Sequence, residues 1–273
     1  MGSRNRRKIM LKYAVKKCGE MAAVARGIGP SAAALYYMQG LRRKLFRLRR
    51  PYRVWSKDAR FPIRLRPGAT DMYVFEEIFV NKQFSCFDPW NGEGLVLDLG
   101  GYTGIFAAYF LSRFPRCRIV TVESDPENFA VLQRNLAPYG DRVRAVHGAV
   151  WSHRTSVCLS EEQLKEGREW AREVREARPG EPGTVPALDI PAILEGSGAD
   201  RIAILKMNIE GAEAVVFSGC ERWLPAVDSL IMHIHDGTGF GPCRERICAA
   251  MEREGFSMSA AGGLTLFTRG KIS

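Results

Sequence analysis

The sequence predicts an α/β fold with one mostly parallel sheet, because short apolar runs alternate with helix-like segments from residue 95 onward. The runs at residues 95–97 and 119–122 have the near-continuous hydrophobicity of strands that are covered on both faces. Between them, Gly100, Gly101 and Gly104 favour a tight turn that opens a helix. A strand, a glycine-rich turn and a helix in this order are typical of a doubly wound sheet.

The remaining elements follow the same alternation. Strands are predicted at residues 95–99, 118–123, 142–150, 202–208, 229–235 and near 264–268, the last of them antiparallel. Helices are predicted between them at residues 103–114, 126–138, 212–223 and 243–254. Right-handed crossovers then bring the carboxyl ends of the parallel strands to one rim, where a ligand is expected.

Two segments flank or interrupt this pattern. Residues 51–68 are predicted to be extended, because three prolines limit helix there, and residues 71–84 to be helical with Thr70 as the N-cap. Residues 160–187 form an insertion that begins with a charged helix over residues 161–178 and continues into a Pro/Gly segment. An insertion of this length is expected to be a lid or a substrate wall, and a solvated excursion is the alternative.

The positive charge is concentrated at the N-terminus. Residues 1–55 hold 15 Lys or Arg against one acid, Glu20, and are predicted to form a basic helical extension broken near residues 27–30. Residues 56–273 are expected to be the main domain. The extension could bind an anionic membrane surface through residues 1–50, or pack on the main domain or on a second copy in a homo-oligomer. Nucleic acid is not favoured, since aromatic residues are not interleaved with the charges.

Composition limits the class of protein further. Seven cysteines are scattered without a C-x-x-C pair, which favours reduced thiols and a cytoplasmic location, at most peripheral to a membrane, over a disulfide scaffold or a zinc site. The sequence contains no uncharged apolar run of 18 or more residues, so no membrane-spanning helix is predicted.

An acidic residue follows the glycine turn at an informative distance. Glu123 ends the second predicted strand, 25 positions after Asp98, about where a doubly wound sheet places the acid that binds a ribose. A dinucleotide enzyme such as a dehydrogenase is the first rival, but its G-x-G-x-x-G register is not met. The pattern D-x-G-x-x-x-G instead resembles the first motif of class I S-adenosylmethionine (SAM) methyltransferases.

A second dense cluster lies at residues 204–213. There a buried strand ends in Lys206, Asn208 and Glu210, which alternate along the strand and so share one face, and Glu213 begins the next helix. Polar groups that emerge from a buried strand are costly without partners, which favours a functional site. An ion pair between Lys206 and a neighbouring acid is the structural alternative.

Four motifs together resemble one family. Residues 66–71 (RPGATD), 98–104 (DLGGYTG), 123–128 (ESDPEN) and 206–213 (KMNIEGAE) are similar, in this order, to motifs of the FkbM family of SAM-dependent methyltransferases. Trp151 and the His235-Asp236 pair fit as well, so the resemblance spans residues 60–270. It implies a Rossmann-like class I methyltransferase sheet, SAM as cofactor, and methyl transfer to a hydroxyl oxygen of a natural product, lipid or sugar.

The chain departs from the family pattern at a few positions. Asn208 stands where the family usually has Asp, Ser124 where it has Pro, Gly101-Tyr102 where it has Ala-Asn, and His233 where it has Glu. An amide at Asn208 removes a carboxylate that a hard cation would prefer, so no resident metal is expected. His233 adds a titratable group two residues from His235.

Methyl transfer requires particular roles of individual residues. His235 is the expected base, because an unperturbed imidazole titrates near ~6.5, and a buried core histidine is the alternative; Lys206 and Glu210 would orient the acceptor. Glu123 would bind the ribose hydroxyls, and residues 149–151 the edge of the adenine. The residues expected to hold the cofactor are Thr70, Asp71, Asp98, Gly100, Gly101, Tyr102, Gly104, Glu123, Ser124, Ala149, Val150, Trp151 and Asn208.

The acceptor is left open by the sequence. A small molecule or a peptide fits, so N-methylation of a peptide amide is an alternative to O-methylation. A SAM-binding adaptor at an anionic surface, without turnover, is the alternative from another functional class.

Overall fold

The computed structural model describes residues 18–46, 50–159, 174–178, 180–235 and 243–272. Its centre is a seven-stranded sheet in the order β12-β13-β11-β10-β3-β4-β5. Five neighbouring strands from β11 to β5 are parallel, whereas β13 runs antiparallel to β11 and β12 antiparallel to β13. The strands are β3 (Gly94–Leu99), β4 (Cys117–Glu123), β5 (Val143–His147), β10 (Ile202–Met207), β11 (Val227–Met232), β12 (Ser257–Ala261) and β13 (Leu264–Thr268).

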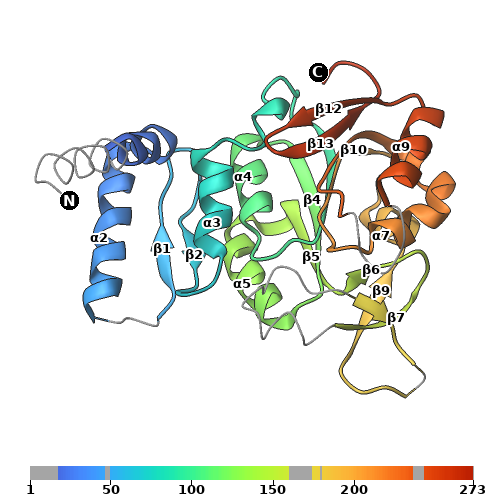
Figure 1. Ribbon diagram of the computed structural model, residues 1–273, viewed down its shortest axis with the longest axis horizontal. Coiled ribbons are helices and arrows are strands. Elements are labelled where there is room, and N and C mark those ends of the chain that lie inside the picture. The colour runs from blue at the N-terminus through green and yellow to red at the C-terminus, as the bar shows by residue number, and fades with distance from the viewer. Residues whose placement is uncertain (1–17, 47–49, 160–173, 179, 236–242, 273) are drawn as a thin grey trace, which may run out of the picture.

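Helices cover both faces of this sheet, as Figure 1 shows. One apolar cluster joins one sheet face to α3 (Asp71–Phe75), α4 (Ile105–Arg113) and α5 (Pro126–Leu136). A second cluster joins the other face to α7 (Ile190–Ser197), α8 (Glu213–Val216) and α9 (Cys243–Arg253). The predicted α/β class and the mostly parallel sheet are therefore confirmed.

The sheet is not the only one, so the prediction of a single sheet is wrong. A two-stranded sheet pairs β1 (Tyr52–Val54) with β2 (Ile63–Leu65) inside the segment predicted to be extended. A four-stranded sheet has the order β6-β9-β7-β8. Its strands are β6 (Ala149–Val150), β7 (Thr155–Leu159), β8 (Val174–Glu176) and β9 (Thr184–Leu188).

The small sheet explains two differences from the predicted elements. The strand expected over residues 142–150 divides at Gly148, where a Cβ would lie 2.9 Å from the carbonyl oxygen of Pro186 in β9. The helix expected over residues 161–178 is contradicted at residues 174–176, which form β8. Residues 160–173, including Trp170, lie outside the described part of the chain.

Two predicted helices and one strand also differ in detail. The helix from Asp71 changes to a π-helical turn, η1 (Glu76–Val80), and ends before residue 84. The helix expected over residues 212–223 is α only to Val216, because Gly219 leaves helical geometry in the following 3₁₀ segment, η4 (Phe217–Arg222). Strand β11 ends at Met232, three residues earlier than expected. The short 3₁₀ turns are η2 (Ser85–Phe87), η3 (Ala137–Arg142) and η5 (Leu224–Ala226).

The N-terminal helices pack on the core at the edge of the molecule. Residues 18–28 are helical, Gly29 interrupts the helix, and α2 (Pro30–Phe46) follows, close to the predicted break. Val24, Ile28 and Ala33 are buried in the same cluster as α3 and α4, whereas the rest of α2 projects away from the sheet (Figure 1). No helix within the described residues is long and apolar enough to cross a membrane.

Candidate functional site

A cavity of about 600 Å³ lies at the carboxyl ends of the parallel strands, at the rim where the sequence predicted a ligand. The turn after β3, the end of β4 and the segment after β10 form one side of it. Residues from α3 and η1, the end of β11 and the turn between β12 and β13 form the other side. A volume of this size is typical of a site for a small molecule or cofactor.

The glycine turn after β3 is shaped by its neighbours in the sheet. Gly100 has φ +81°, and a Cβ there would lie 1.9 Å from the carbonyl oxygen of Asn208. A Cβ at Gly101 would lie 2.2 Å from the Thr121 hydroxyl oxygen. Gly100 is therefore required by close packing against the backbone after β10, and Gly101 by close packing against the Thr121 side chain of β4, in addition to the tight turn that the sequence predicted.

Glu123 ends β4 as predicted, and its carboxylate is held in a fixed position. Its Oε2 accepts a hydrogen bond from the Tyr102 backbone N–H at 2.7 Å, and its Oε1 accepts one from the Asp125 N–H at 2.9 Å. Burial raises the pKa of Glu123 to about 7, although these hydrogen bonds favour the ionised form. Oε1 also accepts from Asn128 Nδ2 at 3.5 Å, whereas Oε2 keeps a further lone pair, so the group could accept a hydroxyl hydrogen bond from a ribose.

Asp98 and Lys206 form a buried ion pair behind the glycine turn. Lys206 Nζ lies 3.0 Å from Asp98 Oδ1 and donates to the Gly100 carbonyl oxygen at 2.6 Å. Asp98 is fully buried, accepts from Thr121 Oγ1 at 2.9 Å, and has its pKa raised by burial against the opposing effect of Lys206. The structural alternative for Lys206, an ion pair with an acid, is thus present, and Lys206 also lines the cavity.

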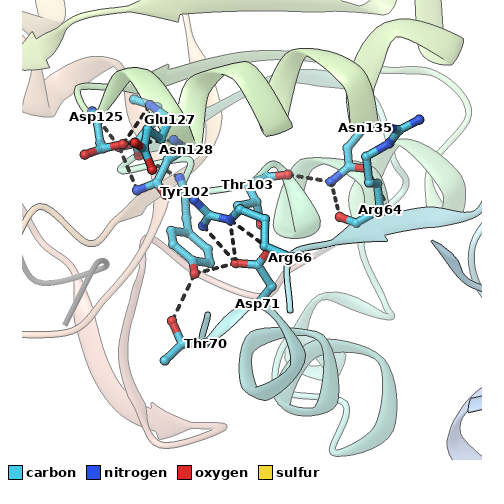
Figure 2. A network of polar contacts seen from close by, with 11 residues as sticks. Arg64, Arg66, Thr70, Asp71, Tyr102, Thr103, Asp125, Glu127, Asn128 and Asn135 are labelled. Carbon is cyan, nitrogen blue, oxygen red and sulfur yellow. Dashed lines mark hydrogen bonds and ion pairs between the residues drawn. The ribbon is translucent and has the colours of Figure 1, made fainter. Parts of the chain in front are cut away.

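A polar network closes the turn from the opposite side, as Figure 2 shows. Asp71 is fully buried and accepts from the Arg66 backbone N–H at 2.7 Å and from the Arg66 guanidinium at 2.8 Å. The Tyr102 hydroxyl donates to Asp71 Oδ1 at 2.6 Å, so the Thr70 hydroxyl, 2.9 Å away, is its donor. Burial and Asp71 raise the pKa of Tyr102, which therefore stays a phenol. Thr70 makes no side-chain cap to α3, contrary to the prediction, because its hydroxyl is directed to Tyr102.

Asn208 carries a polar atom that fits a bound cofactor. Its Oδ1 is buried and has no hydrogen-bond partner among the described residues, yet the residue lines the cavity. A buried acceptor without a donor is costly, and a ligand ammonium or hydroxyl group would satisfy it. Asn208 and Glu123, which both line the cavity, thus offer acceptors to the polar groups of a nucleoside amino acid.

The other residues expected to hold the cofactor divide into two groups. Ser124, Ala149 and Val150 line the cavity directly, together with Thr70, Gly100, Gly101, Tyr102, Glu123 and Asn208. Asp71, Asp98, Gly104 and Trp151 are not among its described lining residues. They lie behind the wall: Trp151, for example, is buried in the small cluster at β6, and its N–H donates to the Leu188 carbonyl oxygen at 2.9 Å.

Two of the three residues expected to act in catalysis, His235 and Glu210, lie together, whereas Lys206 is paired with Asp98 instead. His235 Nδ1 lies 2.8 Å from Glu213 Oε1, and its Nε2 lies 3.4 Å from Glu210 Oε2. Glu213 is fully buried, and its Oε2 accepts from the Gly211 N–H at 2.7 Å. His233 Nδ1 lies 2.8 Å from His235 Nε2. Glu210, His233 and His235 all line the cavity.

Sequence reasoning missed part of the wall. Tyr73, Val74, Glu77, Phe84 and Leu264 line the side opposite the glycine turn, and the Gly262–Gly263 turn of the β12–β13 hairpin closes it. Gln83 Nε2 donates to the Gly262 carbonyl oxygen at 3.1 Å, which joins segments 179 positions apart. Such contacts leave no periodic signal in the sequence. The buried Thr121 in an apolar strand was a signal that could have been used.

Within the part of the chain that the structure describes, no three His, Cys, Asp or Glu side chains are grouped as metal ligands. The expectation of metal-independent chemistry is a matter for a chelator experiment.

Comparisons with known proteins agree with this geometry. Residues 98–258 match the family model described as the methyltransferase FkbM domain, which is more than half of the chain. Methyltransferase sdnD of Sordaria araneosa is 25% identical over 68% of this chain and 82% of its own length. Methyltransferase 1 of Beauveria bassiana is 23% identical over 61% of this chain and 74% of its own length.

Among solved structures, the FkbM methyltransferase of Methylobacillus flagellatus aligns with a TM-score of 0.43 at 14% identity, covering 65% of this chain and 44% of that chain. The family match is shorter than the predicted span of residues 60–270 and does not reach the motif at residues 66–71, but it includes Glu123, Lys206 and His235. The chain belongs to the FkbM family of methyltransferases.

Proposed function

We propose that this protein transfers a methyl group from SAM to a hydroxyl oxygen of a natural product, glycan or lipid. The observation that carries the proposal is one cavity whose lining holds two chemically different groups of residues. Glu123, Tyr102 and Asn208 offer polar atoms to a nucleoside amino acid, and His233, His235 and Glu210 offer acid–base groups. SAM supplies the methyl group on a sulfonium, so the protein has to position the acceptor and take its proton.

The cofactor would occupy the side of the cavity nearest the glycine turn. The ribose hydroxyls would donate to Glu123, and the buried Oδ1 of Asn208 would accept from the amino-acid end. Ala149 and Val150 would contact the adenine. Tyr102, held by Thr70 and Asp71, would close the amino-acid end.

The acceptor would enter from the side formed by η1 and the β12–β13 turn. Its lining there is largely apolar, with Val74, Phe84, Phe106, Ile231 and Leu264, so an acceptor with a hydrophobic body fits. Lys206 is engaged with Asp98, and its contribution would be to hold the Gly100 carbonyl and the floor of the site. Glu210 and the pair of histidines, His233 and His235, would lie nearest the reacting hydroxyl.

The test is transfer from isotopically labelled SAM into candidate acceptors, read by product mass. O-methylation predicts a mass gain of one methyl group on a hydroxyl compound, abolished when the hydroxyl is blocked. Transfer only to a peptide amide would select the alternative acceptor. Tight binding of SAM without turnover by any class of acceptor would select the adaptor.

A reducing compartment is part of the proposal. All seven cysteines are free thiols, including the buried Cys117, Cys220 and Cys243. Free thiols in this number fit the cytoplasm. Association with an anionic membrane surface through the basic N-terminus is proposed as well, and its test is given in the Discussion.

A further inference from the structure

Two histidine rings beyond the end of β11 form a chain that leads to a buried carboxylate. Glu213 Oε1 lies 2.8 Å from His235 Nδ1, and His235 Nε2 lies 2.8 Å from His233 Nδ1. The two rings meet edge to face, with centroids 4.4 Å apart and an angle of 88° between their planes. Each contact therefore uses a different ring nitrogen, and the remaining nitrogen of the chain is His233 Nε2.

Glu213 determines the direction of the first hydrogen bond. Its side chain is fully buried, and it is held by the N–H groups of Gly211 at 2.7 Å and Ile209 at 3.3 Å. A carboxylate only accepts hydrogen bonds, so His235 Nδ1 carries the hydrogen. In a neutral imidazole the other nitrogen is then an acceptor. In neutral His235, Nε2 thus accepts and His233 Nδ1 carries the hydrogen between the two rings, whereas Glu210 Oε2 lies farther from that nitrogen, at 3.4 Å.

The same argument leaves a lone pair on His233 Nε2. With its hydrogen on Nδ1, neutral His233 presents Nε2 as a base, and the residue is exposed and lines the cavity. We propose that His233 Nε2, and not His235, takes the proton of the methyl acceptor. His235 and Glu213 are then positioning residues that fix its tautomer. This inference rests on the proposed methyl transfer.

The proton step balances within the chain. The O–H bond of the acceptor breaks and its hydrogen joins His233 Nε2, while the His233 Nδ1 hydrogen moves to His235 Nε2. The acceptor oxygen forms its bond to the methyl carbon as the carbon–sulfur bond breaks, and that electron pair returns to sulfur. The positive charge rests on His235, with Glu213 at 2.8 Å from Nδ1 and Glu210 at 3.4 Å from Nε2. Reversal along the same chain returns the proton through exposed His233 to solvent.

The charges around His233 keep it available as a base. Burial, His235 and Arg244 lower the pKa of His233, and the carboxylate of Glu213 opposes them. The net direction is downward, so the ring is neutral at neutral pH and holds no proton that would block acceptance. Of the two histidines, His235 is the one that Glu210 contacts.

Nuclear magnetic resonance of ¹⁵N-histidine-labelled protein tests the tautomers without an acceptor. The chain has four histidines, so single substitutions assign every signal. His147 Nε2 faces the Ser124 carbonyl oxygen at 3.2 Å and His153 Nε2 faces Glu176 at 3.3 Å, so both carry hydrogen on Nε2. They are internal controls of opposite tautomer. We expect hydrogen on Nδ1 in both His233 and His235, and hydrogen on Nε2 of neutral His233 would overturn the inference.

Substitutions separate this inference from the proposed function. His235→Phe should release His233 to the Nε2–H form and leave the signals of His147 and His153 unchanged. If that variant does not fold, the wild-type spectrum alone decides. His233→Gln should reduce kcat by about 100-fold or more, the range of a lost general base, with unchanged affinity for S-adenosylhomocysteine (SAH). Full kcat in His233→Gln with loss in His235→Gln would assign the base to His235 and refute the inference. Absence of SAH binding by the wild type would instead refute the methyltransferase proposal.

Discussion

The buried carboxylate of Glu123 makes cofactor binding depend on pH in a way that can be worked out. The pKa of Glu123 is raised to about 7, chiefly because burial disfavours the charged form. Ribose hydroxyls donate hydrogen bonds, and an ionised carboxylate accepts them better than a protonated one. Binding should therefore select ionised Glu123 and release a proton near neutral pH.

The expected magnitude follows from the titration. A pH of about 5.5 lies ~1.5 pH units below the pKa of Glu123, so only about 3% of the carboxyl group is ionised there. Affinity for the cofactor should therefore fall about 30-fold from its value at high pH. That factor corresponds to about 2 kcal/mol. The stability of the free protein depends on pH in the opposite direction to cofactor affinity. The folded pKa exceeds the ordinary value of 4.5, so this group's contribution to stability is full at low pH and falls as pH rises toward about 7.

Isothermal titration calorimetry with SAH would measure both quantities. Titrations from about pH 5.5 to about pH 8.5, in buffers of different ionisation enthalpy, give affinity and the number of protons released. Glu123→Gln keeps the size of the side chain and should bind more weakly at high pH by about 1–3 kcal/mol, with no pH dependence near neutrality. An equal pH dependence in the wild type and in Glu123→Gln would refute the assignment of the ribose to this carboxylate.

Three further predictions address other parts of the chain. Tyr102→Phe removes the hydroxyl that Asp71 accepts, so the free energy of unfolding should fall by about 1–3 kcal/mol in urea denaturation, and an unchanged value would show the network to be dispensable. EDTA should leave methyl transfer by the wild type unchanged, because Asn208 offers no carboxylate to a metal, and Asn208→Asp is the variant that restores one. Wild-type activity that is lost with EDTA and restored by magnesium would contradict metal-free catalysis. Met38 and Leu41 are exposed on one face of α2, so replacing both with Ser should reduce co-sedimentation with anionic vesicles at low salt, and equal binding would eliminate the membrane proposal.

The vesicle experiment needs changes smaller than removal of the whole N-terminal extension, because part of the extension is packed in the core. Val24, Ile28 and Ala33 are buried in the main core, so deleting the first 50 residues would disturb the fold. Deleting residues 1–17 instead removes seven Lys or Arg, each worth roughly 1 kcal/mol at an anionic surface. Vesicles without anionic lipid are the control.

The central sheet was predictable because its information is local. Apolar runs, the glycine turn and the acid at the end of β4 each lie within a few residues, and all three are present where the sequence placed them. The motif at residues 206–213 also predicted a polar cluster correctly. The motif did not predict which partners these side chains have. Lys206 pairs with Asp98 on the neighbouring strand, and Glu213 contacts His235.

The parts that escaped prediction depend on contacts between distant segments. Strand β12 is an edge strand of small, exposed residues without alternation, so it gave no periodic signal. Ala149–Val150 belong to the four-stranded sheet, although the sequence predicts one long strand over residues 142–150. The strand divides there because Gly148 packs closely against β9. The acceptor side of the cavity joins η1 to the β12–β13 turn, and no local pattern reports that junction.

The most direct test of the account is a comparison of two nucleotide ligands by thermal unfolding and calorimetry. A ligand that binds only the folded state raises the melting temperature. We predict that SAH raises the melting temperature and binds with a dissociation constant of micromolar order, and that the dinucleotide NAD does neither. Stabilisation by NAD with no response to SAH or SAM would contradict the assignment of this cavity.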